Sequence, residues 1–167
     1  NFMFDINFLL DHYALWGVFF IIFCETAGAP FPGETLLITA SVLSTLGKLP
    51  IMGIFVIGII AATLGNLTGY LIGMYTGKSI IIKWGKWLYI KPVYVEKGEA
   101  LLQKYGFLFV LIARFIPGAR QVSGIIAGAG AMHFYTFLIA NFLGAILWVG
   151  CWSFGPWLMH YLFVKTL

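Results

Sequence analysis

The sequence predicts an all-α integral membrane protein: an inverted repeat of two re-entrant hairpins and full transmembrane helices, with a central amphipathic segment. The composition is 61% hydrophobic and 10% charged, with a mean hydropathy of +0.96, whereas a soluble domain carries about 25% charged residues. Two uncharged apolar runs, 51–75 and 134–154, are long enough to cross a bilayer, which takes about 20 residues. A length of 167 residues predicts one domain over 1–167.

The first half, 1–77, begins with an interfacial segment at 1–11. An apolar run follows at 13–24, then a Gly/Pro-rich turn and a second short run at 35–46. A twelve-residue helical arm is about 18 Å long, less than the hydrocarbon core of about 30 Å. Two short arms around a proline turn therefore predict a re-entrant hairpin, which is tolerated at depth only where protein or water surrounds it.

The run at 51–75 predicts the first full span. It carries glycines at every fourth position, namely Gly65, Gly69, Gly73 and Gly77. Such a stripe lies on one helix face and lets another backbone approach closely. The stripe is expected to serve packing either within one chain or between two, so a homodimer is an open expectation.

The middle segment, 78–104, contains six lysines mixed with tryptophans and aliphatic residues. This pattern is typical of an amphipathic segment on a membrane surface, although a plain solvated linker would also fit. The lysine cluster predicts a cytoplasmic location, and the connection at 47–50 is then expected outside. A nucleic-acid partner is not expected, because no nucleic-acid motif accompanies the lysines.

The second half, 105–167, repeats the order of the first. A short arm at 107–113, a Pro-Gly turn and a second arm at 121–132 precede the span at 134–154. The depth of the last apolar piece, 156–164, is left open. Because one span separates the two hairpins, they are expected to enter from opposite sides, with their turns near the midplane. Matching interrupted segments of this kind indicate the binding site of a transporter.

Four charged residues flank the two turns. Glu25 and Glu34 lie on either side of the first, and Arg114 and Arg120 on either side of the second. A charge at membrane depth costs about 2.5–3.5 kcal/mol on insertion scales, so such residues are functional by default. A guanidinium group binds phosphate oxygens bidentately, and a break at Pro117 is expected to turn both arginines toward one point. The alternative is that each arginine only neutralises a carboxylate.

Further polar residues extend this candidate site. The expected substrate-binding residues are Arg114, Arg120, Glu25, Glu34, Gln121 and Asn66. Asn66 has a structural alternative, a hydrogen bond between helices, and Glu34 has another, a favourable position at a helix start. Desolvation favours the protonated form of a carboxyl group, so Glu25 and Glu34 are the candidate proton-coupling residues.

No catalytic residue, metal ligand or cofactor is expected, although a proton or sodium gradient would suit the site. The two cysteines, Cys24 and Cys151, lack metal-ligand spacing. A lipid phosphatase needs a nucleophile or base near the arginines, and no histidine lies between His12 and His133. An enzyme is therefore disfavoured.

Three strings carry a family resemblance. They are FCE…PFPGETLL (residues 23–37), GNLTGYLIG (residues 65–73) and ARFIPGAR (residues 113–120). They resemble the DedA family, the bacterial branch of the SNARE-associated/VTT-domain superfamily, over nearly the whole chain. The family often has an aspartate at the position of Asn66 and a basic residue at that of Met74.

The resemblance implies lipid-carrier transport. Members include flippases that return undecaprenyl phosphate across the bacterial cytoplasmic membrane, relatives that scramble phospholipids, and proteins that depend on proton motive force. The family's acidic and arginine pairs match Glu25, Glu34, Arg114 and Arg120. The expectation is a multi-pass protein of the bacterial cytoplasmic membrane that binds a lipid phosphate among membrane lipids. The alternatives are a general phospholipid scramblase and a proton-coupled exporter of small cations.

Overall fold

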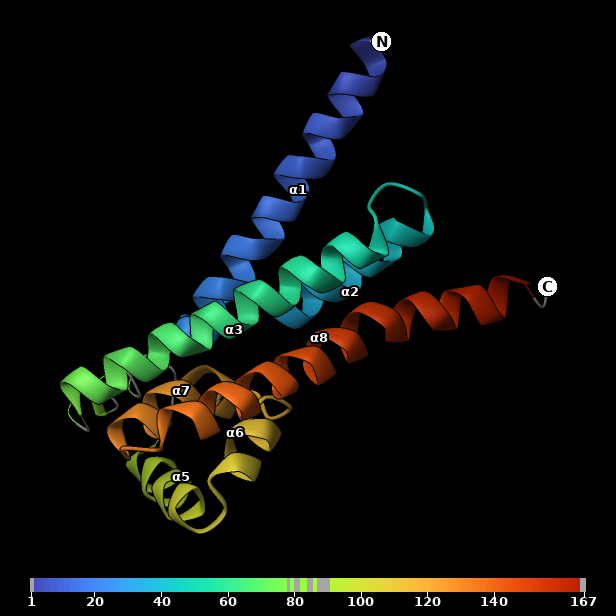
Figure 1. Cartoon of the computed structure of the whole chain (residues 1–167). Coiled ribbons are helices and arrows are strands. Elements are labelled where there is room, and N and C mark those ends of the chain that lie inside the picture. The colour runs from blue at the N-terminus through green and yellow to red at the C-terminus, as the bar shows by residue number, and fades with distance from the viewer. Residues whose placement is uncertain (1, 78, 80–81, 84–85, 87–90, 166–167) are drawn as a thin grey trace.

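The computed structural model describes residues 2–77, 79, 82–83, 86 and 91–165. This part of the chain is helical, without strands, which confirms the predicted all-α class. Its helices are α1 (Phe2–Ala27), α2 (Gly33–Thr45), α3 (Ile51–Thr76), α5 (Pro92–Tyr105), α6 (Phe107–Ala113), α7 (Ala119–Ala129) and α8 (Phe134–Lys165) (Figure 1).

The two candidate membrane spans are α3 and α8, which pack against each other (Figure 1). By length and composition, Ile51–Thr76 and Phe134–Val164 are able to cross a membrane. The predicted final piece at 156–164 is continuous with the second span, because α8 passes through Pro156 without ending. Proline is tolerated inside membrane helices when neighbouring groups satisfy the freed backbone atoms.

Helix α1 differs from the expected short arm. It runs without a break for 26 residues, so the segments expected at 1–11 and 13–24 form one helix. Between Phe2 and Ala27 the sequence has no proline, and its one glycine, Gly17, is not followed by a turn. By contrast, α2, α6 and α7 have 13, 7 and 11 residues and are too short to span at 1.5 Å per residue.

The order of a helix, a turn, a short helix and a long helix occurs twice, as α1–α2–α3 and as α6–α7–α8. The packing corresponds in the same way. Helix α1 packs on α3 as α6 packs on α8, and α2 packs on α8 as α7 packs on α3. One short helix of each half, α2 or α7, thus contacts the long helix of the other half.

Glycines allow the closest of these contacts. A Cβ atom at Gly65 would overlap the carbonyl oxygen of Phe23 in α1, and one at Gly73 would overlap that of Ile125 in α7. On α7, Gly128 lies equally close to the carbonyl oxygen of Tyr70. These glycines therefore serve packing within this chain. Gly77 has another role: it ends α3 with a φ of +66°, a conformation that favours glycine.

Helix α5 lies across the end of α6 and α7 (Figure 1). It buries Val95, Gly98 and Leu102, whereas its lysines, Lys97 and Lys104, are exposed, as expected for an amphipathic helix. Only parts of the segment predicted at 78–104 are described. Trp84 and Trp87 lie outside the described residues.

Two apolar clusters fill the interior. One joins α1, α2, α3 and α8 around Trp148, and the other joins α3, α5, α6, α7 and α8 around Phe137. On α3, Ala62 belongs to the first cluster and Tyr70 to the second, and Asn66 lies between them. Asn66 is therefore held where the two clusters meet on α3.

Candidate functional site

Arg120 is the centre of a buried ion-pair cluster. It lies in the first turn of α7. This helix directly follows Gly118, whose φ of +82° turns the chain into the helix. Its Nη2 atom is 2.6 Å from Glu25 Oε1 and its Nη1 atom is 2.5 Å from Glu34 Oε1. One guanidinium group thus binds two carboxylates, which are contributed by α1 and α2.

The two carboxylates are unequally buried. The Glu25 side chain is 1% exposed at the inner end of α1, whereas the Glu34 side chain, in the first turn of α2, is 30% exposed. Gly33 lies directly against the Glu25 carboxylate, and a Cβ atom there would overlap it. The absence of a side chain at Gly33 therefore leaves room for the carboxylate of the ion pair.

Trp148 covers the same guanidinium group. Its ring centroid is 4.7 Å from Arg120 Cζ, within the range of a cation–π contact. The side chain is fully buried on α8. In the sequence Trp148 is one aromatic residue among many in an apolar span, so no local signal singles it out.

Arg114 lies in a different network. It follows α6, and its Nη2 atom donates to the carbonyl oxygen of Ala62 at 3.1 Å and to Asn141 Oδ1. The residue is 1% exposed, and its Nε and Nη1 atoms are buried without a hydrogen-bond partner. Among the described residues it forms no ion pair with a carboxylate. A buried charge without a counter-ion is unfavourable.

Asn141 connects this network across three helices. Its Oδ1 atom also accepts a hydrogen bond from Asn66 Nδ2 at 3.0 Å, and its own Nδ2 atom donates to the carbonyl oxygen of Thr63 at 3.0 Å. Asn66, as the sequence suggested, bonds between helices. Asn141 was not predicted as a site residue. A single buried amide in an otherwise apolar run was the available signal.

Ser123 completes the buried polar set. Its hydroxyl group donates to the carbonyl oxygen of Arg120 at 3.1 Å and lies 3.4 Å from Asn66 Oδ1, so it links the two arginine networks. Gln121 is half-buried and, over the part of the chain that is described, forms no hydrogen bond with these groups.

The site brings together five of its six predicted residues, but in two groups. Glu25, Glu34 and Arg120 form the ion-pair cluster, and Arg114 and Asn66 share Asn141. The turn between the arginines does not direct both to one point in this state. In the described chain no cluster of three or more His, Cys, Asp or Glu residues suits a metal ion.

Fold and site together define a helical membrane protein in which two arginines and one carboxylate, that of Glu25, are buried where short helices meet two long ones. A VTT-domain model matches residues 31–157. The chain belongs to the VTT-domain (DedA) family of membrane proteins.

The chain is similar in sequence to relatives that carry different names. The chain is 32% identical to "Protein DedA" of Escherichia coli K12, over 84% of this chain and 68% of the relative. It is 34% identical to "Undecaprenyl phosphate transporter A" of Bacillus subtilis, over 70% of this chain and 59% of the relative. An "Alkaline phosphatase-like protein" of Lactococcus lactis is 32% identical, over 84% and 68%. No solved structure matches significantly.

Proposed function

We propose that this protein is a flippase that carries a lipid phosphate, specifically undecaprenyl phosphate, across the bacterial cytoplasmic membrane. The observation that carries the proposal is Arg114, a buried guanidinium group with two unpartnered nitrogen atoms and no carboxylate partner among the described residues. Phosphate oxygens are the matching ligand for such a group. The name of the Bacillus subtilis relative supports the same substrate.

Exchange of partners at Arg120 supplies a mechanism. In the structure two carboxylates occupy its guanidinium group. An arriving phosphate held by Arg114 and Arg120 displaces one carboxylate, and that desolvated carboxylate then binds a proton. Glu25 is the first candidate because it is the more deeply buried of the two. Glu34, which is closer to solvent, is the second. Headgroup movement is thereby coupled to a proton.

The helix order supports an inverted repeat whose two halves move against each other during transport. We infer that the inner end of α1 with α2, and α6 with α7, are the two re-entrant hairpins of the repeat. The support is the corresponding packing of the two halves, in which α2 packs on α8 and α7 packs on α3. Transporters with such repeats bind substrate where the halves meet and alternate by rocking one against the other.

One reconstitution experiment tests the proposed function. Purified protein in liposomes is offered a polyprenyl phosphate, phosphatidylethanolamine or a small cation, and both translocation and phosphate release are scored. We expect polyprenyl phosphate to cross and Arg114→Ala to abolish its crossing. Equal movement of phosphatidylethanolamine would identify a scramblase. Phosphate release would identify a phosphatase, the activity that the Lactococcus lactis name suggests, and cation movement alone would identify an exporter.

A further inference from the structure

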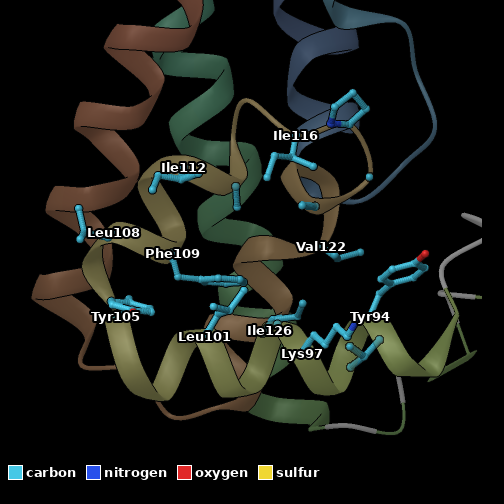
Figure 2. A pocket seen from close by; sticks show the side chains of 16 residues that line it. Tyr94, Lys97, Leu101, Tyr105, Leu108, Phe109, Ile112, Ile116, Val122 and Ile126 are labelled. Atoms are coloured by element: carbon cyan, nitrogen blue, oxygen red, sulfur yellow. The ribbon is translucent and has the colours of Figure 1, made fainter.

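A hollow lies beside the Pro-Gly turn that separates Arg114 from Arg120. A groove of about 800 Å³ runs between α5 and the pair formed by α6 and α7 (Figure 2), within the roughly 300–1,000 Å³ of small-molecule sites. Its walls are apolar, formed chiefly by Leu101, Phe109, Ile112, Ile116, Val122 and Ile126. Such a lining matches a hydrocarbon chain.

The groove has one polar end. Lys97 is the only charged residue among those that line it, and Tyr94 stands beside it, three residues earlier on α5. Residues three apart on a helix share a face. Figure 2 shows both on the α5 side, with Ile116 of the Pro-Gly turn on the opposite side. An occupant with a negative end at Lys97 and an apolar body fits this polarity.

The groove borders the arginine-bearing turn, since Ala113 and Ala119 line it, but neither Arg114 nor Arg120 is among its lining residues. Arg120 contacts residues of α1, α2 and α8, and Arg114 contacts residues of α3 and α8. None of these four helices lines the groove. A lipid whose headgroup lies at Lys97 is therefore not the lipid whose phosphate occupies the arginines.

The groove is open along its length. Leu108, Ile112 and Ile116, all among its lining residues, are 48%, 54% and 51% exposed. In a membrane these residues face acyl chains, so a chain is able to enter sideways without a rearrangement of helices.

We propose that this groove binds one anionic glycerophospholipid of the surrounding bilayer, with its phosphate at Lys97 and Tyr94 and one acyl chain along the apolar walls. The lipid holds α5 against α6 and α7, the two helices that bear the arginines at their ends. The site does not depend on the proposed transport activity.

Native mass spectrometry of the full chain tests the site. The protein is released from micelles that contain equal amounts of phosphatidylglycerol and phosphatidylcholine with matched acyl chains. One lysine near an anionic surface predicts about fivefold more phosphatidylglycerol adduct. Lys97→Gln should remove that preference. Lys104→Gln, on the same helix but outside the groove lining, should keep it.

Chain occupancy is tested with phosphatidylglycerol that carries a photoreactive diazirine on its acyl chain. We expect labelled peptides from α5 to α7, and a loss of labelling in Ile112→Trp and Leu101→Trp, which fill the groove. Ile60→Trp is the control, because Ile60 is 45% exposed on α3 and lies outside the groove. Circular dichroism and gel filtration verify that each variant is folded.

Three results would overturn the proposal: equal adducts of the two lipids, labelling that Ile112→Trp and Leu101→Trp leave unchanged, or labelling by a polyprenyl phosphate probe in place of phosphatidylglycerol. Transport by the unaltered protein is measured in the same preparations. If phosphatidylglycerol labels the groove selectively but the protein moves no lipid phosphate, the phospholipid site is supported and the proposed flippase activity is contradicted.

Discussion

The side-chain oxygen of Asn141 accepts two hydrogen bonds at the same time. One comes from the buried guanidinium group of Arg114, and the other comes from the side-chain amide of Asn66 at 3.0 Å. One neutral residue thus orients a cation and joins α8 to α3. An amide holds the arginine without neutralising it, which keeps the positive charge available to an anion.

This relationship predicts opposite failures for two Asn141 variants. Asn141→Leu removes the acceptor from a fully buried donor set, which costs about 1–3 kcal/mol of stability or more for a charged group. Asn141→Asp supplies a counter-ion for Arg114, so the fold should persist while phosphate binding weakens. Thermal denaturation and headgroup binding separate the two. Asn141→Asp with normal phosphate affinity would show that Arg114 does not bind the headgroup.

The arginines should not tolerate lysine. Lysine keeps the charge but lacks the planar, bidentate fork, so Arg114→Lys and Arg120→Lys should transport almost as poorly as the alanine variants. A lost hydrogen bond to a charged group contributes about 1.5–3 kcal/mol, or about tenfold or more in affinity. Binding of a soluble phosphate analogue measures the loss. Near-normal transport by the lysine variants would mean that charge alone is sufficient.

Glu25→Gln should remove the pH dependence of transport. If the displaced carboxylate takes up a proton when phosphate binds, lipid phosphate binds more tightly at low pH and more weakly as pH rises. Glutamine mimics the protonated form, so binding should persist with a flat profile when it is measured from about pH 5.5 to 8.5. An unchanged pH profile would indicate that Glu34 carries the proton in place of Glu25, and Glu34→Gln is the matched variant.

Gly33→Ala should disturb the ion-pair cluster. The added methyl group would overlap the Glu25 carboxylate, and such overpacking costs about 1–3 kcal/mol. Gly17→Ala is the control: no atom lies within 4 Å of a Cβ there, and alanine stabilises a helix interior by up to about 1 kcal/mol. Thermal denaturation should show a lower midpoint for Gly33→Ala only. Equal midpoints would mean that the carboxylate moves aside freely.

The lysine-rich segment should be cytoplasmic. The reason is the positive-inside rule applied to residues 78–104. Cysteine substituted at Lys86 in a variant lacking the native cysteines should resist an impermeant thiol reagent added to intact cells, whereas cysteine at Lys48 should react. Strong labelling at position 86 from outside would show that the protein has the opposite orientation.

The parts of the fold that the sequence predicted are those that glycine and proline delimit. Helix α6 has the predicted bounds, and α7 lies within three residues of its own, because Gly106, Gly118 and Gly130 mark their ends. Helix α1 was predicted too short because an interfacial pattern does not by itself stop a helix. The apolar piece at 156–164, whose depth the sequence left open, continues α8 because Pro156 does not end the helix.

The residues of the site were easier to predict than their partners. Charged residues inside apolar segments are rare, so Glu25, Glu34, Arg114 and Arg120 stand out in the sequence. Which carboxylate meets which arginine depends on the tertiary packing of α1, α2 and α7. The roles of Asn141 and Trp148 depend on α8 crossing between the two halves, and no local pattern encodes that crossing.

With all four groups ionised, the two guanidinium groups and the two carboxylates of the empty site sum to zero charge. A monoanionic phosphate that arrives with one proton leaves this sum unchanged. The loaded and empty forms then carry the same charge across the bilayer, so a proton-coupled cycle through this site would be electroneutral. It would respond to a pH gradient and be indifferent to the membrane potential, which distinguishes it from a carrier driven by voltage.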